Sequence, residues 1–423
     1  MSEGNIFASV DIGTNTIICL IGRDGENNKL NVVGHSIVAS AGVRRGAVLN
    51  IEEAVAAVQK AVEKASAQLD VKVSRLYVNV AGQHLHTIGR QLSKSIDTGK
   101  IISRADIELL CNEAKATPLD DGEMVYHVIN QSYNVDGEAG IRNPIGISGS
   151  ELLAEYRIVS GPASYYKALK LSLEKAGFEM VKYIVNPIAA ADAVLTDDEK
   201  EAGTVLVDLG AGTTSVAVYY DNVLRHLAII PFGGNVVTND IREGCSIVMR
   251  QAESLKVQYG SAMGEHAPEN KVVTIPGISG WEPKEISFKS LAYIIQARME
   301  EIVESVYYQI EKSGCADRLG AGIVITGGGA RLHALRQLFL FKTGMDVRVG
   351  KPINGILSEN EKVIDNPQYA TAFGLLKKAL SNSKAQNDEL IAKKRNKRPR
   401  PNYGEAFIQK LSFFFNEDQD AEF

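Results

Sequence analysis

Cysteine is scarce in this sequence, and no two cysteines stand close together. The chain has four among its 423 residues. They are Cys19, Cys111, Cys245 and Cys315. Zinc sites and disulfide frameworks use cysteines at short, paired spacings, so this pattern argues against both and fits a reducing cytosol.

Long apolar runs and an excess of positive charge are also missing. No stretch is long and apolar enough to span a bilayer, and the start, MSEGNIFASVDIG, predicts no signal peptide because no basic region precedes an apolar run. The formal net charge of -5 argues against nucleic-acid binding by the molecule as a whole. The remaining composition is that of a globular protein, whose length predicts two or more lobes of about 100–200 residues each.

Two apolar segments are each interrupted by an aspartate and a turn rich in glycine and threonine. In ASVDIGTNTIICLIG, residues 8–22, we expect one strand to end at Val10, a turn over 11–15 and a second strand over 16–21. The segment GTVLVDLGAGTTSVAVYY, residues 203–220, repeats the pattern. Because a whole supersecondary unit recurs at wide separation, the sequence predicts two α/β lobes of similar topology.

Both turns carry residue types that bind phosphate and magnesium. Mg²⁺ takes few carboxylates and keeps several waters, so one aspartate from each lobe, Asp11 and Asp208, suits it through water. Glycine lets backbone N–H groups approach an anion. One such turn alone favours a plain hairpin, whereas two in matching contexts favour nucleotide binding. The expected phosphate-binding residues are Gly13, Thr14, Asn15, Gly210, Gly212, Thr213 and Thr214.

Further motifs give weaker signals for the same site. The glycine loop ITGGGARL, residues 325–332, could lie against a purine or ribose, although such loops often serve packing alone. AESLK places Glu253 and Lys256 at i, i+3 on a helix, a spacing that by itself favours an ordinary ion pair. The residues expected to add to the nucleotide site are Gly234, Asn235, Glu253, Lys256, Gly327, Gly328 and Gly329.

Helical spacing and Asn-Pro pairs indicate the framework. Apolar residues recur at helical spacing after Asn50, which with Glu53 forms an expected capping box, and a long helix is expected over 288–312. Segments beginning Asn-Pro at Pro187 and Pro367 continue into small residues. Those at Ala189, Ala190, Ala372 and Gly374 would let two helices cross closely, as a hinge between lobes requires or as plain packing would.

The C-terminal segment differs in composition from the rest. Residues 381–402 are polar, basic and proline-bearing, which predicts a disordered linker. If the following segment is helical, Phe407, Ile408, Leu411, Phe414 and Phe415 share one face and suit insertion into an anionic membrane surface. The alternatives are a helix that docks back on the protein and a nucleic-acid arm. The acidic end, NEDQDAEF, weighs mildly against the membrane.

In this order the motifs resemble the actin-type ATPase superfamily. DIGTNT and DLGAGTT match its two phosphate loops, TGGGARL its adenosine loop, and the Asn-Pro segments its hinges. The block from 126 to 161, together with VNVAGQHLHTI, GGNVVTNDI, AESLKVQYG and the amphipathic tail, resembles the FtsA family of bacterial cell-division proteins. This resemblance extends over nearly the whole chain.

The resemblance implies a two-lobed actin-like α/β fold with duplicated lobes and an inserted small α+β subdomain. It implies ATP with Mg²⁺ between the lobes, with Glu253 and Lys256 at the adenosine. It further implies filaments, binding of the FtsZ C-terminal tail, contact with later division proteins and no nucleic-acid partner. The expected location is the cytoplasmic face of the bacterial cell membrane at the division site, where the protein would anchor the FtsZ ring.

On this resemblance the chain divides into a first lobe with an insertion, a second lobe and a tail. The expected ranges are 1–83 and 163–202 for the first lobe, 84–162 for the inserted subdomain, 203–223 and 303–380 for the second-lobe core, 224–302 for the upper subdomain that receives the FtsZ tail, 381–402 for the linker and 403–423 for the membrane tail.

Catalytic power is an open question at this point. Filament-forming relatives commonly carry Glu or Gln where this chain has Asn186, to orient the attacking water, so the shorter side chain predicts at most weak ATPase activity. A small-molecule kinase of the same fold is an alternative, although it would need a catalytic base and would have no use for the tail. A pilus-assembly ATPase is another, and a chaperone ATPase would require a further substrate-binding domain.

Overall fold

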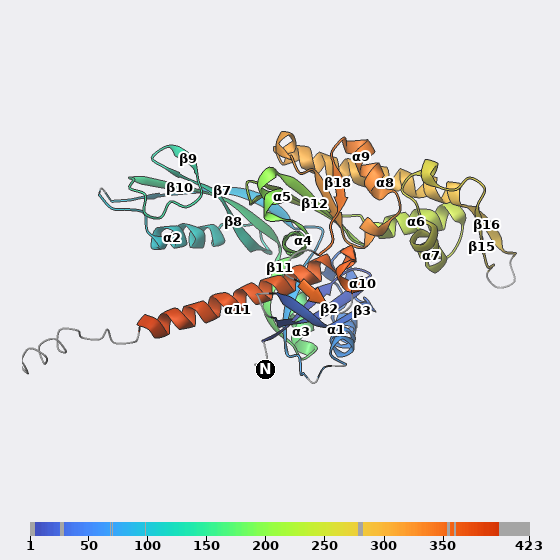
Figure 1. Cartoon of the computed structure of the whole chain (residues 1–423), viewed down its shortest axis with the longest axis horizontal. Helices are drawn as coiled ribbons and strands as arrows, with labels where there is room; N and C mark the ends of the chain where they lie inside the picture. The colour runs from blue at the N-terminus through green and yellow to red at the C-terminus, as the bar shows by residue number, and fades with distance from the viewer. Residues whose placement is uncertain are drawn as a thin grey trace, which may run out of the picture. The chain divides into compact units, whose positions relative to one another are not determined.

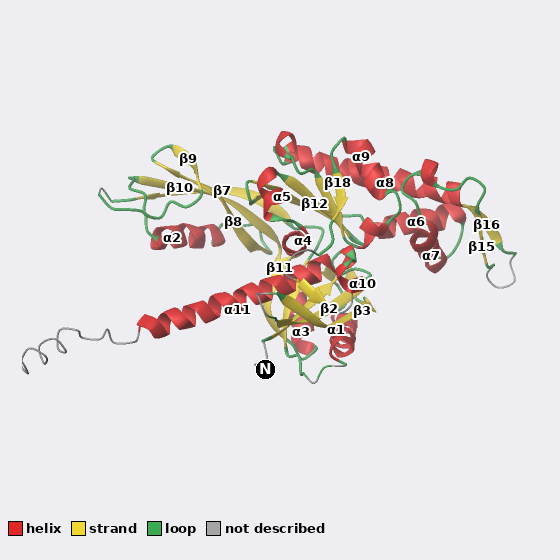
Figure 2. Cartoon of the chain, in the orientation of Figure 1, coloured by secondary structure: helices red, strands yellow, loops and turns green. Residues whose placement is uncertain are grey.

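The structure is a computed structural model that describes residues 5–25, 29–67, 69, 71–97, 99–277, 282–352, 356–358 and 361–396. Its helices and strands form two large sheets and one smaller sheet with helices packed on them (Figures 1 and 2). The described residues up to Ala379 form one compact unit, and those from Leu380 belong to a second.

The first large sheet has six strands in the order β11-β6-β1-β2-β3-β19. Its strands are β1 (Ile6–Ile12), β2 (Thr16–Asp24), β3 (Leu30–Ala39), β6 (Arg75–Val80), β11 (Glu179–Val185) and β19 (Ile356–Ser358). Helices α1 (Ile51–Ser66) and α3 (Ala163–Lys175) pack together beside this sheet. The N-cap of α1 is confirmed, because the Glu53 N–H donates to the Asn50 side chain. The capping box is not complete, since Glu53 Oε1 accepts from Asn50 Nδ2 at 2.8 Å while the Asn50 N–H donates to the Gly42 carbonyl.

The second large sheet repeats the order of the first. It runs β14-β13-β12-β17-β18, and the first runs β3-β2-β1-β6-β11 when read from its matching edge. In both, the hairpin is antiparallel and the next strand is parallel. The predicted duplication is therefore confirmed. The strands are β12 (Thr204–Leu209), β13 (Thr214–Tyr220), β14 (Val223–Ile230), β17 (Ile323–Thr326) and β18 (Val347–Val349).

Helices beyond β14 carry the rest of the second lobe. They are α6 (Gly234–Cys245), α7 (Met249–Tyr259), α8 (Phe288–Lys312) and α9 (Leu335–Thr343), with the hairpin β15 (Val272–Ile275) and β16 (Lys284–Ser287). Helix α8 has the predicted bounds, and its buried stripe, which includes Leu291, Ile295 and Ile302, packs into one core with β12, β13 and β17. Its first N–H groups are capped by Ser287.

The inserted block forms a sheet and a core of its own. Its sheet runs β7-β10-β8-β9, and α2 lies against it. The elements are β7 (His86–Ser95), α2 (Arg104–Lys115), β8 (Glu123–Val135), β9 (Glu138–Ile141) and β10 (Glu151–Pro162). Leu110 and Ala114 of α2 pack on Leu152 and Tyr156 of β10. Strands β7, β8 and β10 also lie beside β14 of the second lobe.

Two helices cross between the lobes. Helix α4 (Asn186–Val194) follows a first-lobe strand yet packs on β12 and β13, and α11 (Ala370–Asn396) follows the second lobe. A Cβ at Gly374 would lie 1.7 Å from the Ala189 carbonyl oxygen, so the helices pass at backbone contact. The predicted close crossing is confirmed, and it requires glycine at this position. Ser9 Oγ also donates to the Ala372 carbonyl at 2.9 Å, which fixes α11 to β1.

The remaining short elements complete the path of the chain. They are β4 (Val43–Arg44), β5 (Ala47–Val48), α5 (Asp197–Ala202), α10 (Glu361–Ile364) and the 3₁₀ turns Gly264–His266, Ala316–Arg318, Gly328–Arg331 and Pro367–Tyr369. None of the helices that the structure describes combines the length and apolar composition of a membrane span.

Four expectations about organisation need correction. Asp11 lies within β1, paired with Ile18, because strand pairing extends the ladder past Val10 despite the low strand propensity of aspartate. Residues 224–230 are a strand of the second sheet, not of an upper subdomain, and 356–358 join the first sheet through β3. Residues 381–396 continue α11, since this stretch is rich in helix formers and the first proline after it is Pro399.

The membrane face predicted at Phe407, Ile408, Leu411, Phe414 and Phe415 lies outside the described residues.

Candidate functional site

A cavity of about 420 Å³ lies between the two aspartate hairpins. The first turn contributes Asp11, Gly13, Thr14 and Asn15, and the second contributes Asp208, Gly210, Gly212 and Thr213. The lining also includes Gly234, Glu253, Lys256, Asn186, Gly327, Gly328 and Gly329. The structure thus brings most of the predicted site residues together, in a volume typical of small-molecule sites.

The two carboxylates have shifted acidities. Burial raises the pKa of Asp208 to about 6. Burial, helped by the negative charge of Asp208, raises the pKa of Asp11 to about 8. Two buried carboxylates that disfavour each other's charge are a favourable setting for a divalent cation, which removes both penalties. No cluster of three or more His, Cys, Asp or Glu side chains occurs within the described ranges, so the donor set fits a cation that keeps its waters.

An amide relay joins the two hairpins across the cavity floor. Asn186 Nδ2 donates to Asp208 Oδ2 at 2.8 Å, and Asn186 Oδ1 accepts from Asn79 Nδ2 at 3.0 Å. Asn79 Oδ1 accepts in turn from the Ile12 N–H at 2.7 Å. The relay runs from β1 through β6 and the start of α4 to β12. Sequence reasoning missed Asn79, whose only signal was one polar residue inside the apolar strand RLYVNV.

The turns expose backbone N–H groups, but not those of the first glycines. Gly13 N–H donates to the Thr16 carbonyl and Gly210 N–H to the Thr213 carbonyl, each at 3.0 Å, so both are used to close their turns. The N–H groups of Thr14, Asn15, Ala211 and Gly212 have no hydrogen-bond partner among the described residues. These residues line the cavity, so the donors suited to an anion come one or two positions after each glycine.

Glu253 and Lys256 form an ion pair that also lines the cavity. Lys256 Nζ donates to Glu253 Oε2 at 2.7 Å, to Thr238 Oγ1 at 2.6 Å and to the Gly234 carbonyl at 3.0 Å. The Lys256 side chain is 14% exposed and that of Glu253 40%. The sequence left open whether Glu253 and Lys256 form an ordinary ion pair or belong to the nucleotide site. They do both, since they pair within α7 and also line the cavity.

The glycine loop lies directly against Asp208. Gly327 adopts a φ of +82°, and a Cβ there would lie 2.3 Å from Asp208 Oδ1. A residue other than glycine would be strained in backbone and would collide with the carboxylate. Beside the loop, Gln368 Nε2 donates to Thr16 Oγ1 at 3.4 Å, which adds a second residue that the sequence did not single out.

Two of the predicted residues lie outside the lining. Thr214 is fully buried in β13 and its hydroxyl donates to the Phe232 carbonyl at 2.9 Å, so its role as a phosphate ligand is wrong. Strand alternation explains this, because adjacent side chains of a strand point to opposite faces. Asn235 pairs instead with Asn15 through two amide hydrogen bonds of 2.8 and 3.0 Å, which join α6 to the first turn.

The duplicated sheets, with an Asp–Gly–Thr hairpin at the cavity from each, define an actin-like ATPase fold. Solved structures of this fold agree. A type IV pilus biogenesis complex, PilM–PilN, is 14% identical with a TM-score of 0.61, covering 88% of this chain and 98% of that one. MreB5 of Spiroplasma citri bound to ADP is 15% identical with a TM-score of 0.55, covering 91% of this chain and 98% of that one. At these identities the likeness establishes the fold alone.

Sequence comparisons identify the family within that fold. The model of cell division protein FtsA matches residues 205–374, and that of the SHS2 domain inserted in FtsA matches residues 82–160. Cell division protein FtsA of Pseudomonas aeruginosa is 32% identical over 378 residues, 89% of each chain. The protein of the same name from Neisseria meningitidis is 33% identical over 379 residues, 89% of this chain and 91% of that one. The chain belongs to the FtsA family of cell-division proteins.

Proposed function

We propose that the protein is a membrane-associated, actin-like adaptor of bacterial cell division that binds ATP with Mg²⁺. In this proposal it self-associates, anchors the FtsZ ring to the cytoplasmic face of the membrane at the division site, and helps recruit later division proteins. The observation that carries the proposal is the cavity between two Asp–Gly–Thr hairpins in a chain of the FtsA family. Membership in this family disfavours a small-molecule kinase or a pilus-assembly ATPase.

The proposed roles of the site residues follow from their geometry. Asp11 and Asp208 hold Mg²⁺ through its water molecules, and the metal neutralises phosphate charge when bound. The N–H groups after Gly13 and Gly210 and the hydroxyls of Thr14 and Thr213 bind phosphate oxygens. Glu253 and Lys256 contact the adenosine, and Gly327, Gly328 and Gly329 leave room for it.

We infer that hydrolysis is slow. A side chain that orients an attacking water needs a free acceptor. The Asn186 carbonyl oxygen accepts from Asn79 and its amide nitrogen donates to Asp208, so this short side chain is fixed in the relay and keeps only one lone pair for a water. Nucleotide therefore acts chiefly as a ligand that joins the lobes. Single-turnover hydrolysis at a rate typical of actin-like ATPases would contradict this inference.

We assign binding of the FtsZ tail to the region of α6, α7, α8 and the β15–β16 hairpin. Apolar side chains outside the nucleotide cavity are exposed there, including Val272 at 54% and Tyr293 at 49%. An FtsZ C-terminal peptide should lose affinity when Val272 or Tyr293 becomes aspartate. Leu171, 42% exposed on α3 of the first lobe, gives a control position.

Liposome flotation tests the membrane part of the proposal. The intact chain, with ATP and Mg²⁺, should float with vesicles that contain anionic lipid and should carry a fluorescent FtsZ tail peptide with it. A chain that ends at Asn396 should stay in the soluble fraction. Phe414→Asp should reduce flotation strongly, whereas Phe413→Asp, off the predicted apolar face, should reduce it less. Equal flotation of the intact and shortened chains would refute the anchor.

A further inference from the structure

A groove runs between the inserted subdomain and the second lobe, away from the nucleotide cavity. Two cavities of about 500 and 590 Å³ share Arg157, Arg225 and Ser313 in their linings, so they adjoin one another. The second follows β14, the edge strand of the second sheet, from Arg225 to Ile229. Side chains of the insert reach this edge, with Gln131 Nε2 donating to the Leu224 carbonyl at 3.0 Å.

Positive side chains from three elements converge on this groove. Arg157 comes from β10, Arg225 from β14 and Lys312 from the end of α8, and the imidazole of His226 on β14 also lines the groove. Burial lowers the pKa of His226, and the charges of Lys312 and Arg157 lower it further. Lys312 and Arg157 therefore both act on His226, although they belong to different subdomains.

Two carboxylates line the groove, Glu155 in the first cavity and Glu123 in the second. Glu155 accepts from Gln91 at 2.8 Å and from Ser132 at 3.3 Å, and Glu123 lies 3.9 Å from His86. Asp221 pairs with Arg225 at 3.8 Å and with Arg142. Within the described part of the chain, the Arg157 guanidinium and the Lys312 ammonium have neither a hydrogen bond nor an ion pair. The groove thus holds more positive charge than its own residues neutralise.

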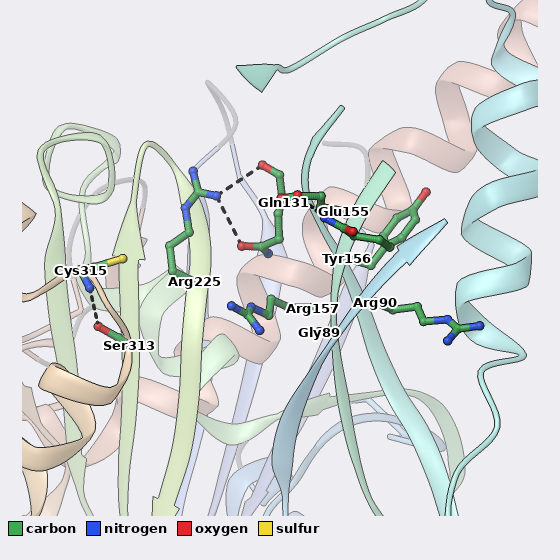
Figure 3. Close-up of a pocket in the computed structure, with 10 residues that line it drawn as sticks. Gly89, Arg90, Gln131, Glu155, Tyr156, Arg157, Arg225, Ser313 and Cys315 are labelled. Atoms are coloured by element: carbon green, nitrogen blue, oxygen red, sulfur yellow. Dashed lines mark hydrogen bonds between the residues drawn. The ribbon is translucent and has the colours of Figure 1, made fainter. Parts of the chain in front are cut away.

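The position of Arg157 is fixed by the strand next to it. Gly89 of β7 lies directly opposite Arg157, and a Cβ at Gly89 would lie 2.9 Å from Arg157 Nη1. The missing side chain makes room for the guanidinium. In Figure 3, Arg157 and Arg225 extend into the space between β10 and β14, whereas Arg90 points away from it. Arg90 is opposite Tyr156, which is buried in the core of the insert, so alternation puts it on the other face.

We propose that this groove binds a short acidic peptide in an extended conformation. Arg157 and Lys312, which no carboxylate of the groove pairs, attract a complementary anion. The two cavities lie in succession along β7, the second lined by His86 and Thr87 and the first by Gly89, Arg90 and Gln91, a stretch of about 20 Å at ~3.3 Å per residue. That length suits carboxylates spaced along an extended chain better than one compact phosphate. A peptide held there would contact the insert and the second lobe at once.

Fluorescence anisotropy with a labelled hexaglutamate peptide and the full chain tests the proposal. We expect saturable binding that Arg157→Ala and Lys312→Ala each weaken by about fivefold or more, because each removes a cation facing the peptide. Gly89→Val should act like Arg157→Ala, since it displaces the guanidinium. Arg104→Ala is the matched control, because Arg104 carries the same charge on α2 of the same insert and lines neither cavity, and it should change the affinity less than twofold.

Binding of a fluorescent ATP analogue provides the check on folding. It should be unchanged in all four variants, because none of these residues lines the nucleotide cavity. Loss of nucleotide binding alone would refute the proposed function and leave this groove untouched. Three results would overturn the groove: no saturable peptide binding, an equal effect of Arg104→Ala, or binding of pyrophosphate that Arg157→Ala weakens with no binding of the peptide.

Discussion

Asp11 and Asp208 occupy matching places in two sheets of the same strand order, yet they are held differently. Asp208 accepts a hydrogen bond from Asn186, and the loop at Gly327 covers it. The Asp11 carboxylate receives no hydrogen bond from any residue that the structure describes. Burial raises the pKa of both groups, to about 8 for Asp11 and only about 6 for Asp208. Duplication of a fold has therefore not duplicated the surroundings of the acidic group.

The difference suggests a division of labour in the proposed site. Asp208 is kept in place by the relay whether or not a ligand is bound. Asp11 has its charge stabilised only when a cation arrives, so it is the group that responds to binding. The predictions below test this asymmetry between the hairpins.

Removal of either carboxylate should have the largest effect. We expect Asp11→Ala and Asp208→Ala each to weaken Mg²⁺-dependent ATP binding by about 10–100-fold, as loss of groups that orient a metal's ligands does. Titration calorimetry with and without Mg²⁺ measures this loss. In urea unfolding without ligand, only Asp208→Ala should destabilise the protein, because it alone leaves a buried donor, Asn186 Nδ2, without a partner. Equal destabilisation by both would contradict the asymmetry.

Breaking the amide relay should have the next largest effect. Asn79→Ala should lower the free energy of unfolding by about 1–3 kcal/mol, because it leaves the Ile12 N–H and the Asn186 carbonyl unsatisfied. Asn186→Ala should cost a similar amount. Since the two amides share a hydrogen bond, the double variant should lose less than the sum of the single losses. Additive losses would mean that the relay does not act as a unit.

The raised pKa values of Asp11 and Asp208 should appear in the pH dependence of the free energy of unfolding, measured without ligand. The folded protein retains the Asp11 proton up to about pH 8, whereas the unfolded chain releases it near pH 3.8. Through Asp11 the folded state therefore binds more protons in this window, and the contribution of this group to stability falls as pH rises, by at most about 1.4 kcal/mol per pH unit. Relative to the unchanged chain, Asp11→Asn should remove this fall between pH 6 and 8. Asp208→Asn should act only below about pH 6. A slope that Asp11→Asn leaves unchanged would refute the shift of Asp11, and one that Asp208→Asn leaves unchanged below pH 6 would refute that of Asp208.

The smallest effect should come from the amide pair that connects the hairpin of Asp11 to α6. Asn15 is exposed, so Asn15→Ala should lower the free energy of unfolding by about 0.5 kcal/mol or less. A double-mutant cycle with Asn235→Ala, read by chemical unfolding, gives the coupling between the two amides. A coupling above about 2 kcal/mol would mean that the pair is a principal link between the lobes.

Local patterns predicted the framework because the forces that set it are local. The cap at Asn50, the bounds of α8 and the recurring Asp–Gly–Thr hairpin each depend on residues a few positions apart. The crossing at Gly374 could also be predicted, since small residues at both Asn-Pro segments have few other uses. The strand and helix patterns of residues 84–161 also predicted a small α+β block that interrupts the first lobe, and the family resemblance agreed with them.

The parts that the sequence could not predict depend on tertiary contacts. Asn79 has a role only because β6 lies beside β1 and faces the start of α4. Thr213 and Thr214 are identical letters, and only the phase of the strand decides which one meets the cavity. The cations of the groove are separated by about 150 positions along the chain, so no sequence pattern joins them.

The first sheet contains strands from both ends of the chain, and this has a consequence for synthesis of the protein on the ribosome. Strand β19 closes that sheet by pairing with β3, and Ser9 of β1 is bonded to Ala372. Since folding follows emergence from the N-terminus, the earliest strands must wait with an open edge until the second lobe has been translated. The first half of the chain, made as a separate fragment, would lack β19 and leave the β3 edge open, whereas the second half contains every strand of its own sheet.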